Sequence, residues 1–332
     1  MKLIKNLFIN LFFFIFFFIT ADFILGKLMP VYDPSGRMVY SSENGVPLIK
    51  KKSAKLRQWK NTGDYNVSVI SNKYGLRNSK EFNNVSKNAF YVVGDSHTFG
   101  HGVEVNERYS NLLEEEFKIG EFINIAIPTN VDGYYKLLKF SKNKGAVINN
   151  IILGLTLEND IHFYEDYKKE SLEKKTLKRN YFSALKEFLT TTSSFYSLLT
   201  SVIHQNENLK RIAIKMKLVK PAHGNINPFS TTEEIVSTIK YIKKIQLEFK
   251  PKNFYVLLLP SRGLWFSKNS EKYFEEHKVV KMILQNQNIN VIDPLLEFIK
   301  SENPKKYYFK YDGHFNKFGH LLLAEQVYKV LK

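Results

Sequence analysis

The sequence of 332 residues contains no cysteine. Disulfide bonds, thiolate catalysis and cysteine-based zinc sites are therefore excluded, and thiol content says nothing about the redox compartment. No internal repeat is evident, and the low-complexity segment is a phenylalanine-rich stretch near the N-terminus. No cluster with metal-ligand spacing is apparent, so we expect neither a metal nor another cofactor.

Acidic residues are also scarce: 32 Asp and Glu face 49 Lys and Arg, which gives a formal net charge of +17. Such an excess is typical of proteins with an anionic partner, such as nucleic acid or an acidic membrane surface. The lysines are scattered, apart from the run Lys50–Lys52 with Lys55 and Arg57, and no nucleic-acid motif accompanies them. We therefore interpret the charge as compositional bias and expect no nucleic-acid partner.

Hydrophobic side chains are plentiful near the N-terminus, where residues 7–29 are long enough to cross a membrane as one helix. This requires that Asn10, Asp22 and Lys27 be tolerated near its ends. We interpret residues 1–29 as a membrane anchor. A signal peptide cleaved after Ile19-Thr20-Ala21 is the alternative, and a buried helix is a third, less favoured one. The first two both export the remaining chain across a membrane.

The rest of the chain divides by pattern. Residues 30–85 are rich in turn formers between short β-prone pieces, which indicates a small β-rich segment. Residues 86–332 alternate between strand and helix patterns, with a break at about 161–230. We interpret this break as a helical insertion on the carboxyl side of the sheet, with a small separate domain as the alternative.

The alternating part predicts five strands separated by helices. Five strands in such an order favour a parallel sheet covered by helices on both faces, that is, an α/β fold. The expected strands lie at about 89–94, 122–127, 147–155, 254–259 and 290–293, and the expected helices at about 107–118, 133–142, 231–249, 270–286 and 316–331.

A serine stands at the end of the first of these strands. The apolar run Phe90–Val93 stops at Gly94-Asp95-Ser96, and ligands of open α/β sheets bind at the carboxyl ends of strands. A serine hydroxyl needs a neighbouring base, and the base needs an orienting group. His314 precedes the last helix with Asp312 two residues before it, so both are predicted to meet Ser96 at one edge of the sheet.

Acyl chemistry at Ser96 would also need hydrogen-bond donors aimed at the developing oxyanion. We identify three candidates: the backbone N–H of Ser96, a backbone N–H near Thr129 after the second strand, and the side-chain amide of Asn159 after the third. We interpret Asp95 as structural and His97, His101 and His320 as loop or rim histidines. The segment Asn72–Arg77 is interpreted as a surface turn, with packing beside the site as the alternative.

Taken together, these motifs resemble the SGNH (GDSL-like) hydrolase family over about residues 65–332. Asn72–Arg77 and Gly100–Val103 resemble segments that flank the Gly-Asp-Ser block in membrane-anchored members. The resemblance implies a three-layer flavodoxin-like fold with strand order 2-1-3-4-5, and ester hydrolysis or acyl transfer through an acyl-serine intermediate. It assigns Ser96 as nucleophile and first oxyanion donor, Asn159 as oxyanion donor, His314 as base and Asp312 as its orienting group.

The sequence departs from the family pattern at three places. Thr129 stands where the second block usually offers a glycine, and Leu157 stands where the third block has one, with Glu158 directly before the Asn. Many members place the Asp three residues before the His, where this chain has Tyr311. The Asp-x-His spacing of Asp312 is a known variant of the family.

Three functions fit these residues. The favoured one is a membrane-anchored serine esterase that acts outside the cytoplasm on an acylated small molecule, glycan or lipid. The second is an O-acyltransferase that uses the same residues with a sugar hydroxyl in place of water. The third is a catalytically silent glycan-binding protein, which the missing glycines suggest and the intact Ser, Asn, Asp and His argue against. If the signal peptide is cleaved, the protein is secreted or periplasmic.

Overall fold

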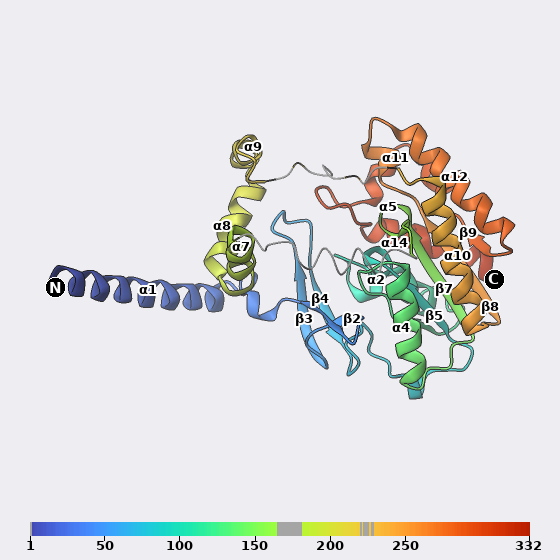
Figure 1. The fold of residues 1–332 in the computed structure, drawn as a ribbon, viewed down its shortest axis with the longest axis horizontal. Helices are drawn as coiled ribbons and strands as arrows, with labels where there is room; N and C mark the ends of the chain where they lie inside the picture. The colour runs from blue at the N-terminus through green and yellow to red at the C-terminus, as the bar shows by residue number, and fades with distance from the viewer. Residues whose placement is uncertain (1, 165–180, 220, 222–225, 227–228) are drawn as a thin grey trace. The chain divides into compact units, whose positions relative to one another are not determined.

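The computed structural model describes residues 2–164, 181–219, 221, 226 and 229–332 (Figure 1). The chain divides into two compact units. The smaller unit comprises residues 1–37, 59–66 and 177–221, and the larger unit comprises residues 38–58, 67–176 and 222–332. The predicted β-rich segment 30–85 is thereby shared between the two units.

The larger unit is built on one sheet of five strands, all parallel. The order of the strands is β6-β5-β7-β8-β9, which is 2-1-3-4-5 in chain order, so the predicted topology is confirmed. Each strand is rich in β-branched or aromatic residues, as suits a sheet buried on both faces. The strands are β5 (Phe90–Gly94), β6 (Phe122–Asn124), β7 (Asn150–Thr156), β8 (Asn253–Leu259) and β9 (Asn290–Ile292).

Helices cover both faces of this sheet, which gives the predicted three layers. Alternate residues of one strand enter two separate cores: Tyr91 and Val93 pack on one face, and Val92 on the other. The first face carries α4 (Val131–Asn143), α10 (Thr232–Phe249) and α12 (Ser270–Asn286). The second face carries α3 (Tyr109–Glu115), α13 (Leu295–Lys300) and α14 (Lys317–Leu331).

The element bounds differ from the predicted ones mainly at the strand ends. The second strand ends at Asn124 rather than at residue 127, because the Asn124 side-chain oxygen accepts a hydrogen bond from Ala126 N and turns the chain. The third begins at Asn150 rather than at residue 147. By contrast, α10 begins within one residue of its predicted start, at a capping box in which Thr231 Oγ1 accepts from Glu234 N and Glu234 Oε2 accepts from Thr231 N.

Short elements complete the larger unit. The strands β1 (Tyr40–Glu43) and β2 (Val46–Ile49) pair antiparallel, and β3 (Ala54–Trp59) forms a second small sheet with β4 (Asn66–Ser71). Three single-turn helices lie at the carboxyl ends of core strands: α2 (Ser96–Phe99) after β5, α5 (Leu157–Asp160) after β7 and α11 (Gly263–Phe266) after β8.

The smaller unit holds the N-terminal helix and most of the described part of the insertion. Helix α1 (Lys2–Leu28) contains a stretch, Lys5–Leu28, that is long and apolar enough to cross a membrane. The insertion contributes three described helices to this unit: α7 (Tyr181–Thr192), α8 (Ser194–Gln205) and α9 (Glu207–Lys215). Residues 165–180, 220, 222–225 and 227–228 of the predicted insertion lie outside the described residues.

The interpretation of Asn72–Arg77 as a surface turn is wrong. The Arg77 side chain is 2% exposed and donates to the carbonyls of Gly100 (2.6 Å), Val103 (2.7 Å) and Ser68 (3.1 Å). Burial lowers the pKa of Arg77 to about 10. Because carbonyls on both sides of Gly102 accept from one planar guanidinium, Arg77 fixes the loop that follows Ser96.

We predict that Arg77→Met destabilises the protein by about 2–4 kcal/mol, because several buried carbonyls lose their donor together. Urea unfolding of the full chain in detergent measures this change. Arg77→Lys keeps the charge but not the planar fork, and its loss should be smaller. A methionine variant as stable as the wild type would show that the guanidinium does not hold the loop.

Candidate active site

Ser96 begins helix α2 directly after β5. Asp95 is the N-cap of this helix, and its Oδ1 accepts from His97 N at 2.9 Å. Gly94 allows the close approach of α2 to the strand, since a Cβ at this position would lie 2.3 Å from Thr98 Oγ1. The serine is therefore held at a strand-to-helix turn at the carboxyl edge of the sheet, as its sequence position predicts.

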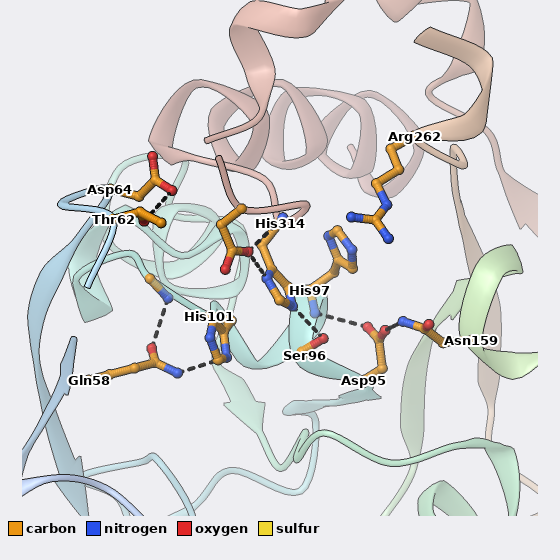
Figure 2. Close-up of polar contacts among 12 residues, drawn as sticks. Gln58, Thr62, Asp64, Asp95, Ser96, His97, His101, Asn159, Arg262 and His314 are labelled. Atoms are coloured by element: carbon orange, nitrogen blue, oxygen red, sulfur yellow. Dashed lines mark hydrogen bonds and ion pairs between the residues drawn. The ribbon is translucent and has the colours of Figure 1, made fainter. Parts of the chain in front are cut away.

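His314 and Asp312 meet Ser96 at this edge, although 218 residues separate Ser96 from His314 (Figure 2). Ser96 Oγ lies 2.8 Å from His314 Nε2, and His314 Nδ1 contacts Asp312 Oδ1. The same Asp312 oxygen accepts from His314 N at 3.1 Å. With a carboxylate on Nδ1, that nitrogen carries the proton, and Nε2 is left to accept the proton of Ser96.

Asn159 is joined to the same turn through Asp95. Its Nδ2 donates to Asp95 Oδ2 at 2.9 Å, and Thr156 Oγ1 donates to Asp95 Oδ1 at 3.0 Å. The Asp95 carboxylate thus connects the end of β5 with the end of β7, which agrees with the structural role predicted for it. An amide nitrogen carries two hydrogens, so Asn159 keeps a second one to donate.

Thr129 is not joined to the other predicted site residues. Its contacts are with α4: Tyr134 OH lies 3.5 Å from its carbonyl oxygen, and a Cβ on Gly133 would lie 2.1 Å from Thr129 Oγ1. Within the described part of the chain, no hydrogen bond links Thr129 to Ser96 or Asn159. The threonine that replaces the family's glycine is accommodated by a glycine four residues later.

Two further histidines flank the His314 ring. The ring of His101 stacks on it at 4.3 Å between centroids, and the ring of His97 lies at 5.0 Å. Figure 2 shows these two rings on opposite sides of His314. Gln58 orients His101: its Oε1 accepts from Gly102 N at 2.8 Å, so its amide nitrogen donates to His101 Nδ1 at 2.7 Å. That contact fixes His101 as the neutral tautomer with its proton on Nε2.

The prediction that His97 and His320 are loop or rim residues is wrong. His97 lies in α2 and is 9% exposed, and His320 lies in α14 and is fully buried against Tyr109. Burial lowers the pKa of His97 to about 4, and it lowers the pKa of His320 well below its usual value. Both rings are therefore neutral near pH 7, and neither adds a positive charge beside His314.

Sequence reasoning missed an ion pair at the rim of the site. Glu158, directly before Asn159, accepts from Arg262 Nε (2.9 Å) and from Ser261 Oγ (2.8 Å). The Arg262 guanidinium lies against Gly313, where a Cβ would come within 1.9 Å of its Nη1. Ser261 and Arg262 follow β8 after Pro260, so the rule that pointed to Ser96 and Asn159 could also have found them.

The trio His101, Asp312 and His314 has the geometry of a cation site, because one ligand atom of each lies within 4.8 Å of the others. The two ring nitrogens of His314 already contact Ser96 and Asp312. A metal ion here would displace one of them, so the arrangement suits proton transfer better than metal binding.

The buried histidines predict an acid-sensitive stability. Their pKa lies below 6.5 in the folded chain, so between about pH 6.5 and 4 the unfolded chain binds more protons. The free energy of unfolding should therefore decrease as the pH is lowered through this window, by about 1.4 kcal/mol per pH unit for each extra proton that the unfolded chain binds. Urea unfolding at pH 7 and 4.5 should show a smaller decrease for His320→Phe. Equal decreases in wild type and variant would contradict the prediction.

No protein-family model and no curated protein matches the sequence. Similar solved structures include a lipolytic protein of the G-D-S-L family from Veillonella parvula, a lipase/acylhydrolase from Enterococcus faecalis and an acetyl xylan esterase from Geobacillus stearothermophilus. They are 13%, 12% and 13% identical, with TM-scores of 0.42, 0.42 and 0.38. Each match covers 73% of this chain and 97%, 94% and 94% of the other.

These identities and TM-scores are too low to support a conclusion about activity. The descriptions of the fold and the site therefore rest on the geometry of this chain. In its strand order and in the meeting of Ser96 with His314 and Asp312, the chain has the arrangement that its resemblance to the SGNH (GDSL-like) hydrolases implies.

Proposed function

We propose that this protein is a serine esterase that removes acyl groups from an acylated glycan, lipid or small molecule through an acyl-serine intermediate. The observation that carries the proposal is the contact of Ser96 Oγ with His314 Nε2 at 2.8 Å, with Asp312 on the other ring nitrogen. Nothing in this mechanism requires a metal or another cofactor.

In the first step, His314 Nε2 takes the proton of Ser96 as the serine oxygen attacks the ester carbonyl. Asp312 holds the His314 Nδ1 proton and stabilises the imidazolium that forms. The neutral His97 and His101 rings do not oppose this charge, whereas a second cation beside His314 would. His314 then gives the proton to the leaving alcohol, and the acyl group remains on Ser96.

The oxyanion of the tetrahedral intermediate needs donors that are fixed before the reaction. The backbone N–H of Ser96 has no acceptor within its own helix because the residue begins α2. The Asn159 amide is oriented by Asp95, which supports its assignment as the second donor. Thr129 remains the third candidate through its backbone N–H, although its contacts lie with α4.

We place the enzyme on a membrane, with α1 as a single-pass anchor and the hydrolase domain on the extracytoplasmic side. The apolar stretch Lys5–Leu28 supports the anchor, and either an anchor or a signal peptide would export the domain.

Ser96→Ala should abolish both ester hydrolysis and covalent labelling. We expect kcat/KM for short acyl nitrophenyl esters to fall by about 10⁴-fold or more, because the nucleophile is lost. A fluorophosphonate probe should label the wild type and not the variant. Ser141→Ala, which changes a fully buried serine of α4, is the matched control and should keep both signals. An unlabelled wild type without turnover would instead indicate the catalytically silent glycan-binding protein.

The acyl acceptor separates an esterase from an O-acyltransferase, because the two share the acyl-serine intermediate. For an esterase we expect free acid as the main product, even when millimolar sugar is present. For a transferase, acylated sugar would form at the expense of free acid, and both products would vanish in Ser96→Ala. Quantifying acid and acylated sugar in one reaction decides between the two.

A further inference from the structure

Helix α8 of the smaller unit buries its polar side chains and exposes its apolar ones, which is the inverse of a helix at the surface of a water-soluble protein. It buries Ser194, Ser197 and Ser201, which are 4%, 2% and 1% exposed. The apolar residues of another face are turned outward: Phe195, Leu199 and Val202 are 47%, 46% and 48% exposed. A helix in water normally turns its apolar face inward, whereas helices in membranes pack through small residues and expose apolar ones.

Helix α9 repeats this inversion. Lys210 and Ala213 are each 6% exposed, whereas Leu209, Ile212 and Met216 are 41%, 54% and 63% exposed. Two adjacent helices with the same inversion form an apolar surface too large for isolated exposed residues to explain. Helix α7 extends it with Leu185 and Phe188, which are 53% and 61% exposed.

This surface is attached to α1 through an acidic side chain. The Asp22 carboxylate accepts from Ser193 Oγ (2.8 Å), Ser194 N (3.1 Å) and Phe195 N (2.7 Å), and so caps the N-terminus of α8. An acidic residue in a membrane helix is costly and needs a partner. Here the partner is the end of α8, which explains why the apolar stretch of α1 contains Asp22.

The contact with α1 also determines how deep α8 would lie in the membrane. The rings of Phe18 and Phe195 lie 5.9 Å apart, and Phe18 precedes Lys27 by nine residues, or about 13 Å of helix. If Lys27 marks the membrane surface, Phe195 lies among the lipid chains. Figure 1 shows α8 running across the axis of α1, as a helix that lies along a membrane surface would.

A cavity lies at the same junction, with a volume of about 590 Å³. Its walls are largely apolar and include Phe18, Phe23, Phe188 and Leu189. Asp22, Thr192 and Ser194 also line it, so one cavity joins polar groups at the end of α8 to apolar walls that suit a lipid acyl chain.

We propose that α7, α8 and α9 lie in the surface of the same bilayer that α1 spans, with Phe195, Val202 and Ile212 turned toward the lipid. The occupant of the exposed apolar surface is the bilayer itself. Cleavage after Ala21 would remove Phe18 and most of the membrane-spanning residues that hold this surface at the bilayer, so the proposal requires that α1 be retained in the mature protein. The proposal depends on α1 lying in a membrane and does not depend on catalysis at Ser96.

Because the chain has no cysteine, single cysteines can be placed freely. We would label Phe195→Cys, Val202→Cys and Ile212→Cys with an environment-sensitive fluorophore in the full chain, reconstituted in phosphatidylcholine–phosphatidylglycerol vesicles. Phe17→Cys in α1 is the lipid-exposed control, and Met282→Cys in α12 is the control in the larger unit; the native side chains are 75% and 53% exposed.

We expect nitroxide-labelled lipids to quench the fluorophore at residues 195, 202 and 212 as they quench it at residue 17, and a water-soluble quencher to act mainly at residue 282. Three labels that behave like the label at residue 282 would overturn the proposal. Protection from both quenchers would also overturn it, because a protein contact would then cover the surface.

Asp22→Leu removes the carboxylate that joins α1 to the start of α8 and tests the attachment, while Ser193 remains the N-cap of α8. Quenching by lipid at residue 195 should decrease, whereas ester hydrolysis, measured on the same samples, should not change. Asp22→Asn keeps one acceptor oxygen and should give an intermediate decrease. The intact mass of protein from membranes should be that of the full chain, 38.8 kDa, and a mass reduced by residues 1–21 would refute retention.

Discussion

The site depends on the hydrogen bonds that the carboxylate of Asp95 accepts. This carboxylate caps α2 at His97 N, accepts from Thr156 Oγ1 and accepts from Asn159 Nδ2. Two neighbouring parallel strands, β5 and β7, end at the same edge of the sheet, and this one buried group joins their ends. The serine and the candidate oxyanion amide are therefore fixed relative to each other before any substrate binds, which is what electrostatic stabilisation of a transition state requires.

His314 comes from near the C-terminus of the chain. The residues around it leave room for one positive charge, which is the imidazolium that forms on His314 itself. His97 on one side is kept neutral by burial, and His101 on the other is oriented by Gln58. Both can pack against the His314 ring without opposing its protonation. Arg77 fixes the loop that carries His101, so a buried cation outside the site also contributes to its geometry.

Much of the fold and of the candidate site could be predicted because it depends on local patterns. Apolar runs that end in Gly-Asp-Ser or before Asn159 indicate strand ends, and strand ends of a parallel sheet share one edge. The exposure of Arg77, His97 and His320 was predicted wrongly, because burial depends on which segments pack over a residue. The rim pair of Glu158 and Arg262 joins two loops about a hundred residues apart, and no local pattern records such a contact.

For this protein, the sequence by itself determined the parallel sheet, the apolar N-terminal helix and the identity of the residues that meet at Ser96, since periodicity and strand ends are properties of neighbouring residues. The tertiary structure alone decided which faces of α8 and α9 are outward and that Asp22 caps α8. An amphipathic pattern indicates that the two faces of a helix differ in polarity, but which face is buried depends on the partner against which the helix packs.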